Sequence, residues 1–259
     1  MTELIELNKF SHIHDGSNII FCKTDFIRTE LSKISKLKND VVLISGNSDY
    51  GIDSSYFVNF PENISSWYAQ NALYNHPKLH PLPLGLENFE FSVRENHGIG
   101  YERAKLKEEL ILNKKQIKPT KKIYSNFKVD TNINYRKVIK NICIKSNYID
   151  WEEPNLTLDG FFSKLQDYEA CVCPIGNGVD THRLWEVLYF ERIPITIKVG
   201  DYKIYELYEK LPIVVLNSAE DLLDGELLFS KINEKKYMYY DKNILNMSHW
   251  INKIKKIES

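Results

Sequence analysis

The most informative stretch of the chain is CVCPIGNGVDTHRLWEVLYFERIPIT, residues 171–196. Apolar residues near its start and end predict two buried strands, at 170–174 and 193–197, and the run between them predicts a helix over 181–190. A turn that contains two glycines joins the first strand to the helix. A strand, a turn, a helix and a second strand in this order predict a parallel sheet of the α/β class.

The turn carries residues that suit a phosphate. Gly176 and Gly178, on either side of Asn177, leave room for a ligand to approach the backbone. Asp180 or Thr181 can cap the helix that follows. The unpaired N–H groups and the helix dipole then face the turn, which favours a bound anion.

Three residues of the predicted helix extend this pattern. Arg183 adds a forked cation for a diphosphate, and His182 beside it is a further candidate contact to a phosphate. Glu186 lies three residues after Arg183, on the same helix face, where its carboxylate can accept hydrogen bonds from both hydroxyls of a ribose. Because phosphate and ribose recur in every nucleotide, the stretch predicts a nucleotide site.

A simpler interpretation uses the same residues. Arg183 and Glu186 can form a surface salt bridge, which contributes little to stability, and the two glycines can merely shape a tight turn. The stretch lacks the third glycine of a dinucleotide-binding fingerprint, and the chain contains no G-x-x-x-x-G-K-[ST] run. The spacing alone leaves both interpretations open.

Strand and helix patterns alternate along the rest of the chain, which predicts two α/β halves. In the second half we expect further strands at 123–127 and 213–216, and helices at 135–145, 158–168, 204–209 and 218–223. In the first half we expect strands at 18–22, 40–45 and 79–84, helices at 25–36, 65–71 and 101–112, and either a strand or a helix end at 56–60.

The basic, proline-containing run 113–122 is the expected linker between the halves. We therefore predict domains at 1–118 and 119–259, with an amphipathic helix at 243–257 after the second domain. The crevice between two such halves is the expected ligand site.

The run PIGNGVDTHRLWEVLYFERIPIT, residues 174–196, resembles the signature of exostosin-like glycosyltransferases and their bacterial and viral relatives. That signature contains, approximately, G-x-G, D-T-x-R, an aromatic residue, E-A-L and G-x-I-P. The matching residues are Gly176, Gly178, Asp180, Thr181, Arg183, Trp185, Glu186, Leu188, Ile193 and Pro194. The chain departs from the signature at Val187, where alanine is usual, and at Glu191-Arg192, where a glycine and one other residue are common.

Weaker similarities to the same family extend over most of the chain beyond Asp40. They cover residues 67–71, 83–88, 124–127, 131–132, 135–136 and 211–223. The resemblance is specific in 170–196 and weak elsewhere.

The resemblance implies a GT-B-like fold, in which two Rossmann-like domains face each other and the C-terminal one holds the donor nucleotide. In that fold a glutamate on the helix after the glycine loop commonly binds the ribose, and Glu186 occupies this place. Arginines commonly balance the leaving diphosphate without a tightly bound metal or other cofactor, and Arg183 and Arg136 are the candidates here. The implied reaction transfers a sugar from a nucleotide-sugar to a glycan or a lipid-linked glycan, as in polysaccharide or lipopolysaccharide assembly.

An inverting transfer also needs a base that takes the proton of the acceptor hydroxyl, and we expect it in the first half. Asp49 is our candidate because it follows the predicted strand 40–45, at the functional edge of a parallel sheet. His76, His80 and Glu87 are alternatives. A turn aspartate and solvent-exposed loop histidines are the simpler interpretation, and both inversion and retention stay open.

Composition and charge argue against several classes of protein. The chain has 259 residues and a net charge of -1, so no global positive field favours nucleic acid. Its strongly apolar runs span about four residues, whereas a transmembrane helix needs about 20. The N-terminal MTELIELNKF has acidic residues and no apolar run, so we expect no secretory signal.

The four cysteines are too few and too scattered for a disulfide framework, which favours a reduced, cytoplasmic protein. We expect Cys171 and Cys173 to pack in a core rather than to bind zinc. The lysine-rich runs 114–122 and 253–256 admit contact with an anionic membrane or an acidic glycan, so peripheral association with the inner face of a membrane is a further expectation. A solvated linker and a helix-end charge cluster are the simpler interpretation.

Two rival functions use the same strand, loop and helix. A Rossmann-type methyltransferase or another nucleotide-sugar-modifying enzyme would carry its glycine loop after the first strand of the domain, whereas the loop here comes late in the chain. A non-catalytic nucleotide- or glycan-binding module would need no base opposite the stretch from Gly176 to Glu186.

Overall fold

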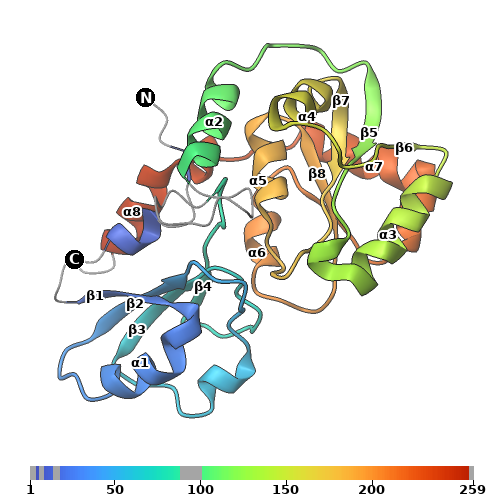
Figure 1. Cartoon of the computed structure of the whole chain (residues 1–259). Helices are drawn as coiled ribbons and strands as arrows, with labels where there is room; N and C mark the ends of the chain where they lie inside the picture. Colours follow the sequence, from blue (N-terminus) through green and yellow to red (C-terminus); the bar gives the residue numbers. More distant parts are fainter. Residues whose placement is uncertain (1–3, 6–8, 14–17, 88–100, 257–259) are drawn as a thin grey trace. The chain divides into compact units, whose positions relative to one another are not determined.

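The computed structural model describes residues 4–5, 9–13, 18–87 and 101–256. Two of the segments quoted above end outside these residues, at Asn88 and Ile257. Contacts divide the chain into a first unit, Met1–Lys105 with Asp201–Leu207 and Asp241–Ser259, and a second unit, Leu106–Gly200 with Tyr208–Tyr240. In the described part of the chain, each unit contains one sheet of parallel strands (Figure 1), which confirms the predicted α/β class.

These bounds differ from the expected division at residue 118. The boundary falls inside helix α2, Tyr101–Leu112, rather than in the basic linker that follows it. The tail helix α8, Met247–Lys255, groups with the first unit, where a β-bridge joins Leu4 to Asn246 just before it. This grouping differs from the expected place of the helix as a tail of the second domain.

The sheet of the first unit has the order β1-β2-β3-β4 in the described residues. Its strands are β1 Ile19–Lys23, β2 Val41–Gly46, β3 Ile64–Ala69 and β4 Leu79–Pro81. All six residues of β2 are buried, as expected of a parallel strand that is covered on both faces. Helix α1, Ile27–Ile34, packs its buried residues Ile27, Leu31 and Ile34 into the same core as Trp67 of β3.

Strand β3 corrects the helix predicted over 65–71. Trp67 and Ala69 lie on the strand face that packs against the core of α1, and β3 pairs with both β2 and β4. The Trp67 indole N–H donates to Ser45 Oγ on β2 at 2.9 Å. Aromatic residues fit such a pleated, buried position well, and pairing with β2 and β4 makes this segment a strand.

The second unit contains strands in the order β6-β5-β7-β8-β9 among its described residues. They are β5 Lys121–Ser125, β6 Ile149–Trp151, β7 Tyr168–Val172, β8 Ile193–Ile197 and β9 Val214–Leu216. Its α-helices are α3 Ile133–Lys145, α4 Leu158–Leu165, α5 His182–Tyr189 and α7 Gly225–Lys236. The short helix α6, Tyr205–Tyr208, is divided between the units, and only Tyr208 belongs to the second. In Figure 1, α3 and α7 lie on one side of this sheet and α4 and α5 on the other.

Short 3-10 helices complete the described structure. They are η1 Lys9–His12, η2 Thr24–Phe26, η3 Ser54–Phe57, η5 Asp130–Asn132, η6 Glu220–Leu223 and η7 Lys242–Leu245. A 3-10 helix ends at Phe57, so the segment 56–60 contains a helix end and no strand. The helix expected at 218–223 is a single 3-10 turn over Glu220–Leu223.

Two elements of the second unit were not predicted. Strand β6 is only three residues long and carries no clear alternation. Helix α7 begins at Gly225, a poor helix former, but the Asp224 carboxylate accepts a hydrogen bond from the Leu227 N–H at 3.0 Å and caps it. Gly225 is needed there because a Cβ atom would lie 2.4 Å from the Tyr148 ring.

Cys171 and Cys173 are buried in the second unit, at 0% and 1% exposure, which confirms that they are core residues. Cys22 and Cys143 are also buried thiols. Of the helices that the structure describes, none has the length and apolar character needed to cross a membrane.

Candidate functional site

The glycine loop lies where the strand order of the second sheet reverses. The chain leaves β5 for β6 on one side, and then returns to β7 on the other side and continues outward to β8 and β9. In open parallel sheets, the loops after two such neighbouring strands diverge and leave a crevice at the carboxyl ends, where ligands bind. Residues 126–132 follow β5 and residues 173–181 follow β7, so the predicted loop occupies this position.

Arg136 of α3 holds the loop in place. Its guanidinium donates from Nε to the Ile175 carbonyl at 2.7 Å and from Nη2 to the Pro174 carbonyl at 3.1 Å. The Asn132 amide donates to the Gly176 carbonyl at 2.9 Å. A Cβ atom at Gly176 would lie 3.2 Å from Arg136 Nη2, so the glycine allows this close approach.

The charge of Arg136 has no anionic partner among the described residues. Its third hydrogen bond also goes to a backbone carbonyl, that of Lys128, at 2.8 Å. The residue is 9% exposed, and burial together with the charge of Arg183 lowers its pKa to about 10, so it stays protonated at neutral pH. A buried cation without a carboxylate is costly, and a bound anion would offset that cost.

Asp180 supports the fold of the loop through its carboxylate. Its carboxylate accepts hydrogen bonds from the Trp185 indole N–H and from the Tyr208 hydroxyl, each at 2.9 Å. The backbone N–H of Thr181 donates to Asp180 Oδ1, also at 2.9 Å. With 2% of its surface exposed, Asp180 ties the loop to α5 and to Tyr208, and its contact with a nucleotide stays a prediction.

Thr181 is the N-cap residue of α5, but its hydroxyl caps nothing. Its Oγ1 atom is buried and has no hydrogen-bond partner in the described structure. Its methyl group lies 3.7 Å from where a Cβ atom of Gly176 would be, so the threonine lines the same loop. Asn177 is exposed, and Gly178 and His182 are half-buried. A buried hydroxyl without a hydrogen-bond partner is costly, so this group marks a place in the loop where the described structure leaves a polar atom unsatisfied.

Glu186 pairs with two cations, one on each oxygen. Lys107 Nζ of α2 lies 2.7 Å from Glu186 Oε1, and Arg183 Nε lies 3.0 Å from Oε2. The side chains of Lys107 and Glu186 are only 2% and 6% exposed. Burial alone would raise the pKa of Glu186, but the two positive charges outweigh it and lower the pKa to about 2. Lys107 and Glu186 therefore form a buried ion pair, and the Arg183–Glu186 contact is part of this buried cluster rather than an isolated surface salt bridge.

Arg183 is fixed on three sides. It donates to Glu186 and to the backbone carbonyl of Asn126 after β5, and its guanidinium lies 3.7 Å from the centre of the Phe161 ring. Burial acts to lower its pKa, but the Glu186 carboxylate reverses this effect and the pKa is raised. Arg183 therefore links the ends of β5 and α5 at the strand-order reversal.

Lys107 was not predicted from the sequence. The signal was present, because Ala104, Lys107 and Ile111 share one face of α2 and all three are buried. A lysine on the apolar face of a helix indicates a buried acidic partner. Which acidic residue that would be follows only from the folded structure.

The predicted base, Asp49, belongs to the first unit. It lies exposed in the loop after β2, at the carboxyl end of that strand as expected. The alternatives lie in the same unit: the His76 ring packs 4.3 Å from the Phe57 ring, and Glu87 is buried 3.6 Å from Arg103. The role of Asp49 as a base stays a prediction.

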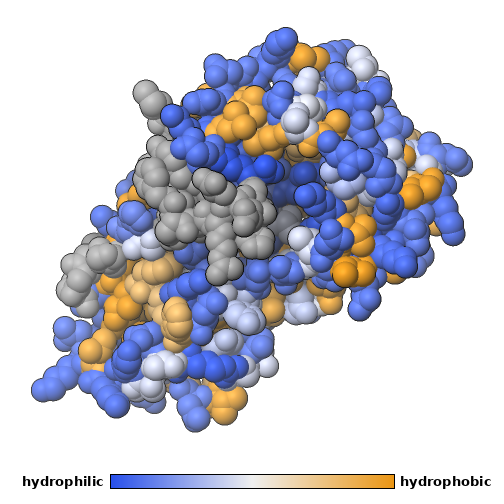
Figure 2. Space-filling model, viewed as in Figure 1, coloured by the Kyte–Doolittle hydropathy of each residue, from blue (hydrophilic) through white to orange (hydrophobic). Residues whose placement is uncertain are grey.

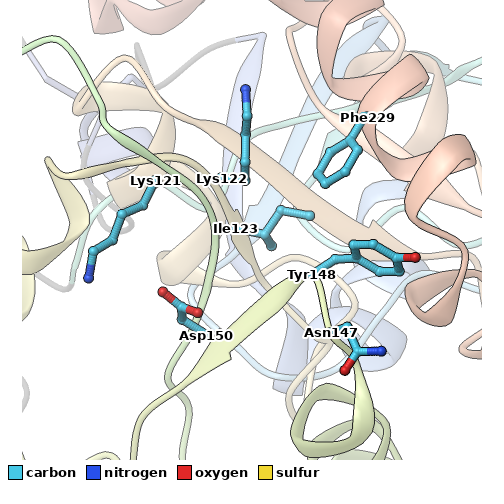
Figure 3. Close-up of a pocket in the computed structure, with 7 residues that line it drawn as sticks. All are labelled: Lys121, Lys122, Ile123, Asn147, Tyr148, Asp150 and Phe229. Carbon is cyan, nitrogen blue, oxygen red and sulfur yellow. The ribbon is translucent and has the colours of Figure 1, made fainter.

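A pocket elsewhere in the second unit is a weaker candidate for a ligand site (Figure 3). It has a volume of about 280 Å³ and lies at the amino ends of β5 and β6, opposite the edge where parallel sheets bind ligands. Lys122 already pairs with Glu169 at 3.0 Å, and Asp150 accepts from the Tyr168 hydroxyl at 2.8 Å. Its charged groups are thus largely engaged within the fold.

Among the described residues, no group of three or more His, Cys, Asp or Glu side chains is placed to hold a metal ion. A scan against protein-family models and a search of curated proteins both find no match. The similarity to exostosin-like glycosyltransferases therefore stays a prediction based on residues 174–196 and the weaker segments around them.

The buried ion pair can be tested by a double-mutant cycle. Lys107→Met removes one partner from a buried carboxylate, so we expect the free energy of unfolding in urea to fall by about 3 kcal/mol. Glu186→Met should cost more than Lys107→Met, because it leaves both Lys107 and Arg183 without this carboxylate, and Lys107→Met/Glu186→Met should cost less than the two single changes added together. The exposed control on the same helix, Lys105→Met, should change stability by no more than about 0.5 kcal/mol. Strictly additive effects would contradict a direct pair.

The low pKa of Glu186 predicts a pH dependence. Because its folded-state pKa lies below the unfolded value of about 4.5, its contribution to stability is complete above pH 4.5 and is lost as the pH falls toward 2. The stability gap between wild type and Glu186→Gln should therefore narrow by up to about 3 kcal/mol over that window. Urea unfolding at several pH values measures it, with the exposed Glu62→Gln as the control. A gap that does not change with pH would contradict the assignment.

Proposed function

We propose that the chain is a glycosyltransferase that takes a sugar from a nucleotide-sugar and adds it to a glycan or a lipid-linked glycan. The observation that carries the proposal is the buried guanidinium of Arg136 beside the glycine loop. It has backbone carbonyls as its only hydrogen-bond partners in the described structure, and it lies where the strand order reverses. A diphosphate there would supply the missing negative charge.

The neighbouring groups fit the rest of a nucleotide diphosphate. The Thr181 hydroxyl and the first N–H groups of α5 can donate to phosphate oxygens. Each oxygen of Glu186 accepts from one cation and retains a second acceptor position, so the carboxylate can still accept from the hydroxyls of a ribose. Lys107 and Arg183 would then hold this carboxylate ionised and in place.

In the proposed transfer, the bond between the sugar C1 and the diphosphate oxygen breaks, and the acceptor oxygen bonds to C1. The diphosphate leaves with the electron pair, and Arg136 and Arg183 stabilise the charge that develops on it. In an inverting reaction, the proton of the acceptor hydroxyl passes to a base, for which we propose Asp49. This mechanism takes the two α/β units as the two facing domains of a GT-B enzyme.

The donor site is tested by thermal shift with UDP, GDP, CMP, ADP, dTDP and their common sugars, with and without Mn²⁺. A nucleotide at a hundred times its dissociation constant should stabilise the fold by about 2.7 kcal/mol and raise the Tm by several degrees. Arg136→Gln should abolish the shift. Arg192→Gln is the matched control, because Arg192 also donates to backbone carbonyls, those of Ile117 and Gln166, but at the amino edge of the sheet.

The control should lower the Tm and keep the nucleotide-dependent shift. If no nucleotide shifts a cooperative melt, or if both arginine variants lose the shift equally, the donor site is not at Arg136.

Asp49 separates the transferase from a nucleotide-binding module without catalysis. We expect Asp49→Asn to keep the thermal shift of the wild type and to lose release of the nucleotide from its nucleotide-sugar by about a hundredfold or more, as loss of a general base predicts. The adjacent, exposed Tyr50→Phe serves as the control and should keep turnover. Unchanged release in Asp49→Asn would remove Asp49 from the mechanism, and no release in the wild type would favour the binding module.

A further inference from the structure

The amino edge of the second sheet gathers segments that are distant in sequence. The linker after α2 runs along it, with the N–H groups of Thr120 and Lys121 donating to the Asp167 carbonyl at 3.0 Å. Arg192, before β8, donates to the carbonyls of Ile117 and Gln166, each at 2.9 Å. The end of α7 joins the same edge, because Lys236 and Lys122 both pair with Glu169, at 3.0 Å each.

Positive charge is concentrated on this edge. Residues 113–122 contain five lysines and no acidic residue, although the whole chain has a net charge of -1. Glu169 and Glu191 offset part of this charge by pairing with Lys122, Lys236 and Lys114. Lys115 and Lys118 are exposed, and no carboxylate in the described structure pairs with either.

Large apolar and aromatic side chains are exposed among these cations. Tyr237 and Tyr239, just after α7, are 81% and 93% exposed, and Leu112 and Ile117 of the linker region are 63% and 39% exposed. Burial and the nearby Glu191 raise the pKa of Tyr240, which places the end of this segment close to the partner of Lys114. In the view of Figure 2, the end of the unit crossed by the linker is mainly hydrophilic with hydrophobic side chains set among it.

We propose that this edge, defined by Leu112–Lys122 and Lys235–Tyr239, docks on the surface of an anionic lipid bilayer. Tyrosine favours the boundary between lipid headgroups and acyl chains, and lysines nearby attract anionic headgroups. Exposed leucine and isoleucine favour a lipid surface over a nucleic acid or an acidic glycan, neither of which offers an apolar layer to them. The inference goes beyond the proposed function and does not depend on it.

The test is flotation of the full chain with vesicles of phosphatidylcholine, with and without phosphatidylglycerol. We expect the wild type to float with the anionic vesicles only, and less so as salt is added. Lys115→Glu/Lys118→Glu should weaken binding by about tenfold or more. Tyr237→Ser/Tyr239→Ser should lower the fraction that stays bound at high salt, because these side chains contribute a non-ionic part of the contact.

Lys36→Glu/Lys38→Glu is the matched control, since it makes the same change of charge at two exposed lysines of the first unit. It should float like the wild type. The proposal is overturned if the wild type ignores anionic vesicles, if the control loses binding as much as Lys115→Glu/Lys118→Glu, or if the chain binds heparin or RNA but not vesicles. Circular dichroism of each variant establishes that it is folded before flotation.

Discussion

The hydrogen bonds from Arg136 to the carbonyls of Pro174 and Ile175 determine where the glycine loop lies, and the rest of the site depends on that position. With Asn132 bound to the Gly176 carbonyl, they join the helix after β5 to the loop after β7. These are the two strands between which the sheet reverses direction. The constraint is electrostatic as well as geometric, because the loop gains three donors and also a buried positive charge.

The balance of charge around the loop favours an anion. Among the described residues, Glu186 pairs with both Arg183 and Lys107, whereas no carboxylate pairs with Arg136. Glu186 screens Arg183 and Lys107 directly, whereas the described contacts of Arg136 are backbone carbonyls and an aromatic ring. An arrangement that served stability alone would gain more from a carboxylate at Arg136. The charge of Arg136, without a carboxylate in the described structure, is therefore the strongest physical argument for the proposal that the site binds a charged ligand.

Local patterns in the sequence predicted the parts of the fold that depend on near neighbours. The apolar run of β2, the strand, loop and helix around Gly176, and the shared helix face of Arg183 and Glu186 all follow from spacing within a few residues. Strand β3 could not be predicted in this way, because Trp67 gains its place by pairing with Leu43 of β2 and Leu79 of β4, which lie 24 and 12 residues away. The role of Lys107 could not be predicted from local spacing either, because its partner Glu186 lies 79 residues later in the chain.

The contact-based units differ from the expected domain bounds for a related physical reason. A lysine-rich, proline-containing run resembles a linker by composition, yet here it forms backbone hydrogen bonds along the second sheet. The division falls instead within α2, a continuous helix with no local signal of a boundary. Composition reports how a segment is solvated, whereas the assignment of a segment to a unit depends on contacts that only the folded chain makes.

Hydrogen–deuterium exchange of the full chain, with and without each of UDP, GDP, CMP, ADP and dTDP, tests most directly whether the glycine loop is the nucleotide site. At saturation with the nucleotide that binds, exchange should slow in peptides covering residues 126–136 and 174–184, and stay unchanged at 147–150 beside the amino-edge pocket. Unchanged exchange around the loop with every nucleotide, or protection centred on the amino edge instead, would contradict the assignment.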